Sequence, residues 1–229
     1  MEEVNQLTLA GPIIPYQAEV DYTIKHIPVK RCFDIVFSLL CLVFGCPVFL
    51  LIALLIYATS PGRVIYAQER IGRGGKPFRC YKFRSMFPNA DQRLEELLRR
   101  DPELKKEWDH SHKLKRDPRI TPFGLFLRKT SLDELPQFWN VLKGDLSVVG
   151  PRPVVKEEIE KFYCVKAYKI LSIRPGLTGP WQVSGRSNVQ SYQQRIQLDE
   201  AYIDNQSFLL DLKLIGKTLP AMLFSKGAY

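Results

Sequence analysis

Cysteine and histidine are scarce in this chain, and neither is spaced like a set of metal ligands. The 229 residues contain five cysteines and three histidines, with no Cys-x-x-Cys pair. This pattern argues against a structural zinc site and a disulfide framework, and it predicts reduced thiols in a reducing compartment. The cysteines are Cys32, Cys41, Cys46, Cys80 and Cys164.

Two signatures of phosphate and nucleic-acid binding are also missing. The glycine-rich residues 72–76 lack the Gly-Lys-Ser/Thr ending of a P-loop, so they are more typical of a turn than of a nucleotide cradle. Basic and aromatic residues interleave nearby, but no RNP, zinc-finger or helix-turn-helix motif accompanies them. The sequence therefore gives no specific support to a nucleic-acid-binding domain.

Charged side chains are absent between Asp34 and Arg63, where Leu, Ile, Val and Phe dominate. This run lies too far from the start for a signal peptide, and no small-residue cleavage site follows it. As a helix with a rise of ~1.5 Å per residue, the apolar residues 35–59 would be about 37 Å long. This length is enough to cross a hydrocarbon core of about 30 Å. We therefore predict a membrane segment.

The shape of this membrane segment has two interpretations. Pro47 in its middle removes a helical hydrogen bond and predicts a kink. Basic residues flank both ends, so the positive-inside rule favours a cytoplasmic location for both. A hairpin that enters and leaves on one face satisfies both observations, whereas a kinked spanning helix also tolerates proline, so both remain open. The flanking residues are Lys25, Lys30, Arg31, Arg63, Arg70, Arg73 and Lys76.

Length and composition predict one catalytic domain with an anionic partner. A chain of this length with 45% hydrophobic residues can bury one sizeable core. Its formal net charge of +9 suits nucleic acid, an acidic membrane surface or a phosphorylated substrate. Strand-like residues 64–68 and 77–86 flank the glycine turn and predict a hairpin. The predicted class is α/β or α+β, mostly helical, with this small strand element.

Several helices are predicted from their caps and periodicity. Asn89 precedes a helical pattern over residues 91–100, Asp101 resembles the cap of a second helix, and Thr121 opens a third. Residues 189–205 are also helical in pattern. Residues 208–224 combine apolar residues with a few charges and a proline, which favours helices in the bilayer interface, with a core helix as the alternative.

Two adjacent carboxylates, Asp133 and Glu134, are the strongest candidates for chemistry. Ser131 and Glu134 fit a capping box, which would give both carboxylates a purely structural role at a helix start. The same position, with Arg128 and Lys129 nearby, would keep Asp133 ionised for use as a nucleophile or Mg²⁺ ligand. Pro136 predicts that this helix is distorted or begins later than the box implies.

Candidate phosphate contacts come from three further segments. Partial alternation over residues 78–84 would turn Lys82, with Arg79 or Arg84, away from a packed face. Arg152 stands between two prolines that fix its backbone. Binding of its guanidinium to a phosphate would therefore cost little further conformational entropy. Residues 174–186 carry turn signals that predict an ordered loop, with Trp181 either in the core or against a nucleotide base. Arg186 is a weaker phosphate candidate.

Five motifs in this order resemble the bacterial sugar transferase family, the monotopic phosphoglycosyl transferases, over residues 30–224. They are Lys30-Arg31-Cys32-Phe33-Asp34, Tyr81-Lys82-Phe83-Arg84-Ser85-Met86, Leu127-Arg128-Lys129-Thr130-Ser131-Leu132-Asp133-Glu134-Leu135-Pro136-Gln137, Val149-Gly150-Pro151-Arg152-Pro153 and Arg174-Pro175-Gly176-Leu177-Thr178-Gly179-Pro180-Trp181-Gln182-Val183-Ser184-Gly185-Arg186. Two features depart from the family: Cys46-Pro47 replaces its frequent Ser-Pro, and only about 29 residues precede Lys30, as in a short form. Residue 199, an aspartate, matches a family acidic position for which we expect a structural role.

The resemblance implies transfer of a sugar 1-phosphate from a UDP-sugar to polyprenyl (undecaprenyl) phosphate with release of UMP, the first membrane step of exopolysaccharide, O-antigen or capsule assembly. It implies that Asp133 is the nucleophile, that Glu134 is its partner, and that both bind Mg²⁺. A nucleophilic carboxylate that attacks an anionic diphosphate needs a metal and basic residues. The implied phosphate or substrate contacts are Arg128, Arg152, Lys82, Arg84 and Arg186.

The resemblance also implies the domain organisation and the location. Residues 1–29 would be a tail, residues 30–60 a re-entrant membrane hairpin, and residues 61–229 the catalytic domain with C-terminal interfacial helices. This places the protein on the cytoplasmic face of the bacterial inner membrane, in contact with lipid and without nucleic acid; a homo-oligomer is compatible with the sequence. Residues 181–186 resemble those of family members that use UDP-galactose or UDP-glucose, which favours galactose or glucose as the transferred sugar.

Two other functions remain alternatives on the sequence alone. One is a bitopic anchor whose basic domain binds nucleic acid or acidic lipid, which would require the ends of the membrane segment to lie on opposite faces. The other is a phosphodiesterase that uses the same carboxylates on lipid-linked diphosphates. Labelling of the two ends tests the anchor, whereas product release without sugar transfer to lipid would identify the phosphodiesterase.

Overall fold

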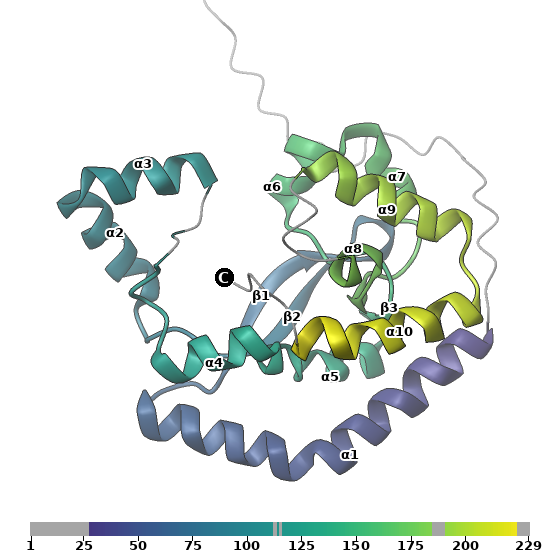
Figure 1. Cartoon of the computed structure of the whole chain (residues 1–229), viewed down its shortest axis with the longest axis horizontal. Coiled ribbons are helices and arrows are strands. Elements are labelled where there is room, and N and C mark those ends of the chain that lie inside the picture. Colours follow the sequence, from purple (N-terminus) through teal and green to yellow (C-terminus); the bar gives the residue numbers. More distant parts are fainter. Residues whose placement is uncertain (1–27, 112–113, 115, 185–190, 224–229) are drawn as a thin grey trace, which may run out of the picture.

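The chain folds as one long apolar helix beside a body of short helices and strands (Figure 1). The computed structural model describes residues 28–111, 114, 116–184 and 191–223. The longer helices are α1 (Pro28–Thr59), α2 (Ala90–Arg100), α3 (Pro102–Ser111), α4 (Pro122–Thr130), α5 (Gln137–Lys143), α9 (Tyr192–Asp204) and α10 (Phe208–Leu223). The shorter helices and single turns are η1 (Arg73–Gly75), η2 (Leu132–Glu134), α6 (Lys156–Glu158), η3 (Ile159–Tyr163), η4 (Cys164–Lys166), α7 (Ala167–Ile170) and α8 (Pro180–Val183). The mostly helical class is confirmed.

The predicted hairpin is present as β1 (Ile65–Ile71) and β2 (Pro77–Phe83), which pair in antiparallel register. Gly74 and Gly75 in the connection have φ angles of 66° and 75°, in the left-handed region that glycine adopts at least cost. The Gly74 N–H donates to the Leu171 carbonyl at 2.8 Å. The glycine-rich turn therefore also fastens the hairpin to the body.

A second strand pair was not predicted. β3 (Ser147–Val149) and β4 (Gly176–Thr178) pair in parallel, and β4 lies within residues 174–186, which the sequence suggested were a loop. A Cβ on Gly150 or Gly176 would overlap the backbone of the other, so glycine allows this close approach. The pair fixes the two segments that carry Arg152 and Trp181.

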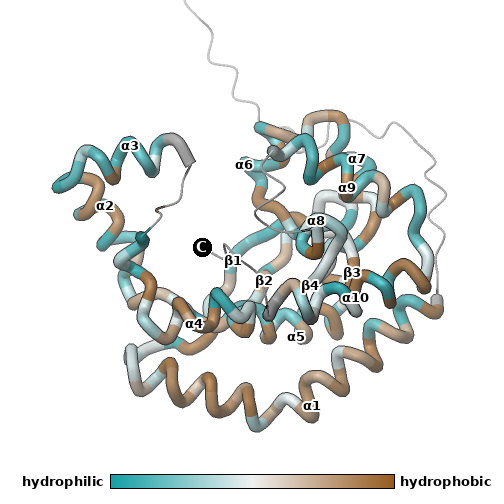
Figure 2. Tube along the Cα trace, in the orientation of Figure 1, coloured by the Kyte–Doolittle hydropathy of each residue, from teal (hydrophilic) through white to brown (hydrophobic). Residues whose placement is uncertain are grey.

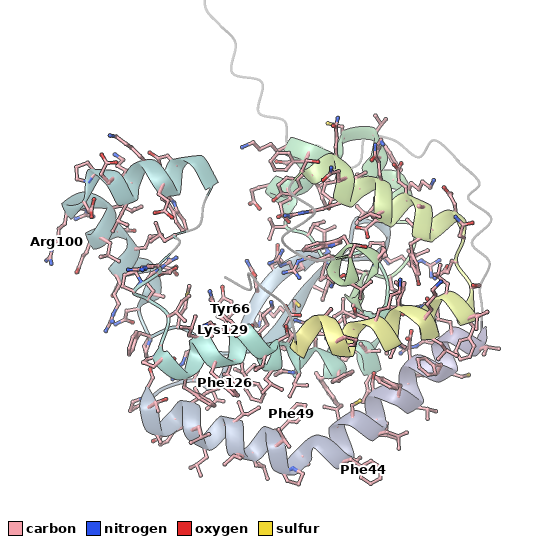
Figure 3. The ribbon with its side chains drawn as sticks, viewed as in Figure 1. Phe44, Phe49, Tyr66, Arg100, Phe126 and Lys129 are labelled. Carbon is pink, nitrogen blue, oxygen red and sulfur yellow. The ribbon has the colours of Figure 1, made fainter. Side chains whose placement is uncertain are left out.

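Helix α1 is apolar along almost its whole length (Figure 2). By length and composition alone it could cross a membrane, and within the described part of the chain no other helix could. The structure keeps it as one helix with Pro47 inside, and Figure 1 shows a bend near its middle. Phe44 points away from the body and is 77% exposed, whereas Phe49 points towards the body and packs against Phe83 (Figure 3).

Both ends of α1 are fixed to the same body. Near its start, Lys30 Nζ lies 2.7 Å from Asp211 Oδ2 of α10, and Arg31 donates to the Val141 carbonyl of α5 at 2.7 Å. Near its end, Ile52 and Ile56 are buried in a cluster with Phe83 and Leu127. In Figure 1, α4, α5 and α10 lie between α1 and the rest of the body.

The predicted helix starts are mostly confirmed. Thr121 Oγ1 accepts from the Gly124 N–H at the start of α4, and Asp101 Oδ1 accepts from the Glu103 N–H at the start of α3. Asn89 precedes α2, but its side chain makes no capping bond. Helices α9 and α10 occupy the predicted segments, of which residues 189–190 and 224 lie outside the described residues. All five cysteines are free, as predicted.

Candidate active site

An open pocket of about 940 Å³ lies on the side of the body away from α1 and brings together segments distant in sequence. Its walls come from the β hairpin, the start of α2, the junction of α4 and α5, and helices α6, α8 and α9. Lining residues with polar or aromatic side chains include Tyr66, Gln68, Arg70, Lys82, Arg84, Arg128, Asp133, Glu134, Arg152, Glu158, Trp181, Tyr192 and Arg195. Most of the predicted site residues therefore share one pocket.

The carboxylate pair occupies a tight turn between two helices. Ser131 ends α4 with a φ of 56°, and residues Leu132–Glu134 form the single turn η2. The Ser131 side chain makes no capping bond, so the predicted capping box is wrong. The reason is that the left-handed backbone of Ser131 serves as the end of α4 rather than the start of the next helix. Helix α5 begins only at Gln137, after Pro136, as the proline predicted.

The surroundings of Asp133 favour its neutral form more than water does. Its side chain is buried, with 8% exposure. Burial, and then the neighbouring charge of Glu134, raise the pKa of Asp133 to about 6, while Lys82 and Arg128 act in the opposite direction. Asp133 is therefore mostly ionised at neutral pH, although more weakly than an exposed aspartate.

Two basic side chains approach Glu134. Lys82 Nζ from β2 lies 2.7 Å from Glu134 Oε1, and Arg152 Nη1 lies 4.0 Å from the same oxygen. Arg152 stands between buried Pro151 and Pro153, which follow β3. The predicted grouping of Lys82 and Arg152 with the carboxylates is present in the structure.

The other predicted phosphate contacts have different surroundings. Arg128 Nε donates to Ser85 Oγ at 2.8 Å and lies near enough to Asp133 to affect its pKa. Arg84 lines the pocket, but its guanidinium donates to the Ser60 carbonyl just after α1. This contact gives Arg84 a role in joining α1 to the body. Arg186 lies outside the described residues.

Trp181 belongs to the core rather than to an open base-binding surface. Its side chain is 7% exposed, and two guanidinium groups lie against its ring. Arg195 Cζ is 4.7 Å and Arg152 Cζ is 5.6 Å from the ring centroid. The indole therefore supports two cations through cation–π contact.

Sequence reasoning missed Glu158, Tyr192 and Arg195, which also line the pocket. The Tyr192 hydroxyl donates to Glu158 Oε1 at 2.8 Å, and Arg195 Cζ lies 5.0 Å from the Tyr192 ring centroid. Glu158 belongs to a run of charged residues, and Arg195 to a helix with several other polar residues, so nothing in their local sequence marked them. Only their convergence in space identifies them.

Asp199 is buried on α9, with 1% exposure. Burial raises the pKa of this carboxyl to about 8, while the charge of Arg152 acts to lower it. Within the described part of the chain, Asp199 Oδ1 has no hydrogen-bond partner. A neutral Asp199 is thus the main form at pH 7, beneath the wall that carries Arg152 and Arg195.

The donor set of the pocket matches Mg²⁺ better than zinc. No cluster of three or more His, Cys, Asp and Glu side chains suitable for a metal occurs among the described residues. Mg²⁺ commonly takes one or two carboxylates and completes its coordination with water and substrate phosphate. Asp133 and Glu134 could supply those carboxylates. The arrangement of an ionisable aspartate among several cations suits chemistry on a phosphate group.

Comparison with known proteins identifies relatives of this architecture. The family model described as bacterial sugar transferase matches residues 25–225. The exopolysaccharide production protein ExoY of Rhizobium meliloti is 46% identical over 200 residues, which cover 87% of this chain and 88% of that protein. The undecaprenyl-phosphate galactose phosphotransferase of Salmonella typhimurium is 49% identical over 201 residues, covering 87% of this chain and 41% of that protein.

A third relative is named for a different sugar. The UDP-glucose:undecaprenyl-phosphate glucose-1-phosphate transferase of Klebsiella pneumoniae is 38% identical over 208 residues, which cover 87% of this chain and 41% of that protein. The chain thus matches most of ExoY, but less than half of the longer relatives. The residues 25–225 that match the family model include all the residues that line the pocket described above.

Proposed function

The chain belongs to the bacterial sugar transferase family, and from this premise we propose that it transfers a sugar 1-phosphate from a UDP-sugar to polyprenyl phosphate and releases UMP. One observation carries the proposal: Asp133 and Glu134 share an open pocket with Lys82, Arg128 and Arg152. A nucleophile, its acidic partner and the cations that an anionic diphosphate requires are thereby within one site.

Asp133 is the nucleophile in this proposal. A carboxylate oxygen attacks the phosphorus that bears the sugar, and the bond from that phosphorus to the bridging oxygen breaks. UMP leaves with the bridging oxygen and its electron pair. A phosphate oxygen of polyprenyl phosphate then attacks the same phosphorus, which releases the Asp133 carboxylate and yields the polyprenyl diphosphate sugar.

The surrounding residues would reduce the repulsion between a carboxylate and an anionic donor. Lys82 and Arg152 lie beside Glu134, and Arg128 lies on the Asp133 side of the turn. Asp133 and Glu134 would hold Mg²⁺, which when bound supplies Lewis-acid neutralisation of phosphate oxygens.

We further propose that α1 is re-entrant, entering and leaving the membrane on one face as a single helix that bends near its middle instead of as a two-armed hairpin. Support comes from the attachment of both its ends to one body: Lys30 and Arg31 on α10 and α5, and Ile52 and Ile56 against Phe83 and Leu127. A spanning helix would place its two ends on opposite faces of the bilayer, where one body on one face could not contact both. The same contacts argue against the bitopic-anchor alternative.

The layer of helices next to α1 would rest at the membrane interface. Large apolar side chains are exposed on α4, α5 and α10, namely Leu125, Phe126, Trp139, Leu209 and Leu212. Figure 3 shows Phe126 pointing from α4 towards α1. Apolar side chains on this layer suit the headgroup boundary, where the phosphate of a polyprenyl phosphate resides. We propose that this interface is the cytoplasmic face of the bacterial inner membrane.

The donor sugar is proposed to be galactose or glucose. The relatives from Salmonella and Klebsiella are named for transfer of these two sugars, and ExoY is named for exopolysaccharide production. The name of ExoY supports a role in exopolysaccharide production, and we propose that this role is the first membrane step of exopolysaccharide or lipopolysaccharide assembly.

A transfer assay tests the proposed function. Purified protein in nanodiscs receives Mg²⁺, polyprenyl phosphate and radiolabelled UDP-galactose or UDP-glucose, and label in the lipid phase is counted. We expect lipid labelling with one of the two donors, no labelling after EDTA treatment, and none with Asp133→Asn. UMP release without label in lipid would favour the phosphodiesterase, and undiminished transfer by Asp133→Asn would remove the proposed nucleophile.

A further inference from the structure

Arg195 is a cation held in place by aromatic rings. Its guanidinium carbon lies 4.7 Å from the Trp181 ring centroid and 5.0 Å from the Tyr192 ring centroid. Its Nε is buried and has no hydrogen-bond partner within the described part of the chain. No ion pair of Arg195 with a described carboxylate occurs either. A positioned cation of this kind in a pocket is suited to bind an anion.

A second cation connects Arg195 to the catalytic carboxylates. Arg152 contacts the Trp181 ring on one side and lies 4.0 Å from Glu134 on the other. Starting from Glu134, the pocket wall therefore presents Arg152, then Trp181, then Arg195. Two linked cations in a row match two linked phosphates better than a single phosphate.

The wall continues beyond Arg195 with groups suited to sugar hydroxyls. Tyr192 stacks on Phe162 with ring centroids 3.8 Å apart and an interplanar angle of 6°, so its ring is fixed. Its hydroxyl donates to Glu158 Oε1, and both residues line the pocket. A carboxylate has about four acceptor sites, so Glu158 can accept further hydrogen bonds from the two hydroxyls of a diol while it accepts one from Tyr192.

The position of this wall indicates which substrate it meets. Helices α6 and α9 lie on the far side of the body from α1 in Figure 1. A lipid-linked phosphate would enter from the α1 side. The far wall is therefore open to the soluble donor rather than to the acceptor.

We propose that Arg195 binds the phosphate of the departing nucleoside monophosphate, and that Tyr192 and Glu158 bind its ribose diol. This inference rests on the proposed function and assigns the UMP half of the donor to this wall of the pocket. When Asp133 forms its bond to the sugar-bearing phosphorus, the bond to the bridging oxygen breaks, and that oxygen leaves on UMP with the electron pair. Arg195 stabilises the negative charge that develops there.

Isothermal titration calorimetry with UMP tests the role of Arg195 directly, because UMP carries only this half of the donor. Arg195→Gln should weaken UMP binding by about 10- to 100-fold, the range for loss of a charge-assisted hydrogen bond. Arg100→Gln is the matched control, since Arg100 is exposed at the end of α2 and does not line the pocket. It should bind UMP as the wild type does. If Arg195→Gln does not fold, Arg195→Lys replaces it, with an expected loss of about 3- to 10-fold because the bidentate geometry is lost.

The ribose assignment has its own ligand control. Glu158→Gln and Tyr192→Phe should each weaken UMP binding, but should have less effect on 2′,3′-dideoxyuridine monophosphate, which lacks the diol. Equal losses with both ligands would overturn the ribose contact.

Further outcomes separate this inference from the proposed function. Unchanged UMP affinity in folded Arg195→Gln, together with wild-type sugar transfer, would overturn the inference alone. A loss confined to the polyprenyl phosphate KM would assign Arg195 to the acceptor and would also overturn it. Absence of sugar transfer in the wild-type protein would instead contradict the proposed function.

Discussion

At the scale of single residues, the ionisation of Asp133 controls the proposed reaction. The pKa of Asp133 is raised to about 6, chiefly by burial, and only the carboxylate form can attack phosphorus. The rate of UMP release in a single turnover without acceptor should rise with pH while Asp133 is mostly protonated and then level off, at a pH below about 6 because bound Mg²⁺ would stabilise the carboxylate. Rapid-quench measurements across this range, in a constant Mg²⁺ concentration, check the prediction. A flat profile would mean that Asp133 ionisation does not limit the step.

The same pKa predicts a cost in stability. The folded protein binds a proton at Asp133 more tightly than the unfolded chain, whose aspartate has the ordinary value of 3.8. Below about pH 4, Asp133 is protonated in both states and burial of its carboxyl does not lower the free energy of unfolding. Between about pH 4 and pH 6 this free energy falls, and above about pH 6 it is lower by about 3 kcal/mol. Asp133→Asn should raise the Tm at pH 7.5 and leave it nearly unchanged at pH 4. Thermal unfolding of both proteins in the same detergent provides the measurement, and a lower Tm for the variant at pH 7.5 would contradict it.

Most residues that the sequence proposed for the site do meet there. Lys82, Arg128 and Arg152 come from segments far apart in the chain, yet all lie near Asp133 and Glu134. Resemblance to family motifs supplied these assignments, because spacing alone could not bring the segments together. Arg195 could not be predicted, since its role depends on the packing of α8 against α9 and on the rings of Trp181 and Tyr192.

At the scale of elements, close packing of α4 on the end of the hairpin positions Arg128. Gly124 lies against Ser85, and a Cβ at Gly124 would overlap the Ser85 carbonyl. Gly124→Ala should destabilise the protein by about 1–3 kcal/mol, as overpacking usually does, and should reduce transfer by displacing the Arg128–Ser85 contact.

A second helical glycine is the control for this substitution. Gly216 in α10 has no neighbouring atom within 4 Å of an added Cβ, so Gly216→Ala should leave the Tm unchanged or raise it. Thermal unfolding and the transfer assay are run on both variants. Equal stability of the two variants would show that the α4 contact does not constrain the site.

Local signals predicted the hairpin, the caps at Asp101 and Thr121, and the late start of α5. They failed at Ser131, because serine is typical of a helix start but here ends α4 with a left-handed backbone. They also missed β3 and β4, because strands of three residues paired across a long separation leave no periodic pattern.

At the scale of the whole molecule, the central question is where the two ends of α1 lie relative to the membrane. Single cysteines at Ala18 and Asn89, in a background without the five native cysteines, should both react with an impermeant thiol reagent only when the cytoplasmic face is accessible. Inverted vesicles and intact spheroplasts provide the two orientations. Labelling of the two sites from opposite faces would establish a spanning helix and would revive the bitopic anchor.

The attachment of α1 at both ends also explains why sequence alone left its shape open. Pro47 and the flanking charges are compatible with a hairpin or with a kinked spanning helix. The distinguishing contacts, from Lys30 to Asp211 and from Ile56 to the cluster around Leu127, join residues far apart in the chain. Their effect is visible only when the whole molecule is assembled.

The most direct test of the whole account is the intact mass of the protein after incubation with Mg²⁺ and UDP-galactose or UDP-glucose, without a lipid acceptor. We predict a hexose-phosphate adduct on the wild-type protein, equimolar UMP release, no adduct on Asp133→Asn, and loss of the adduct when polyprenyl phosphate is added. Folded wild-type protein that transfers sugar to lipid but never carries an adduct would contradict the covalent role of Asp133 and indicate direct transfer.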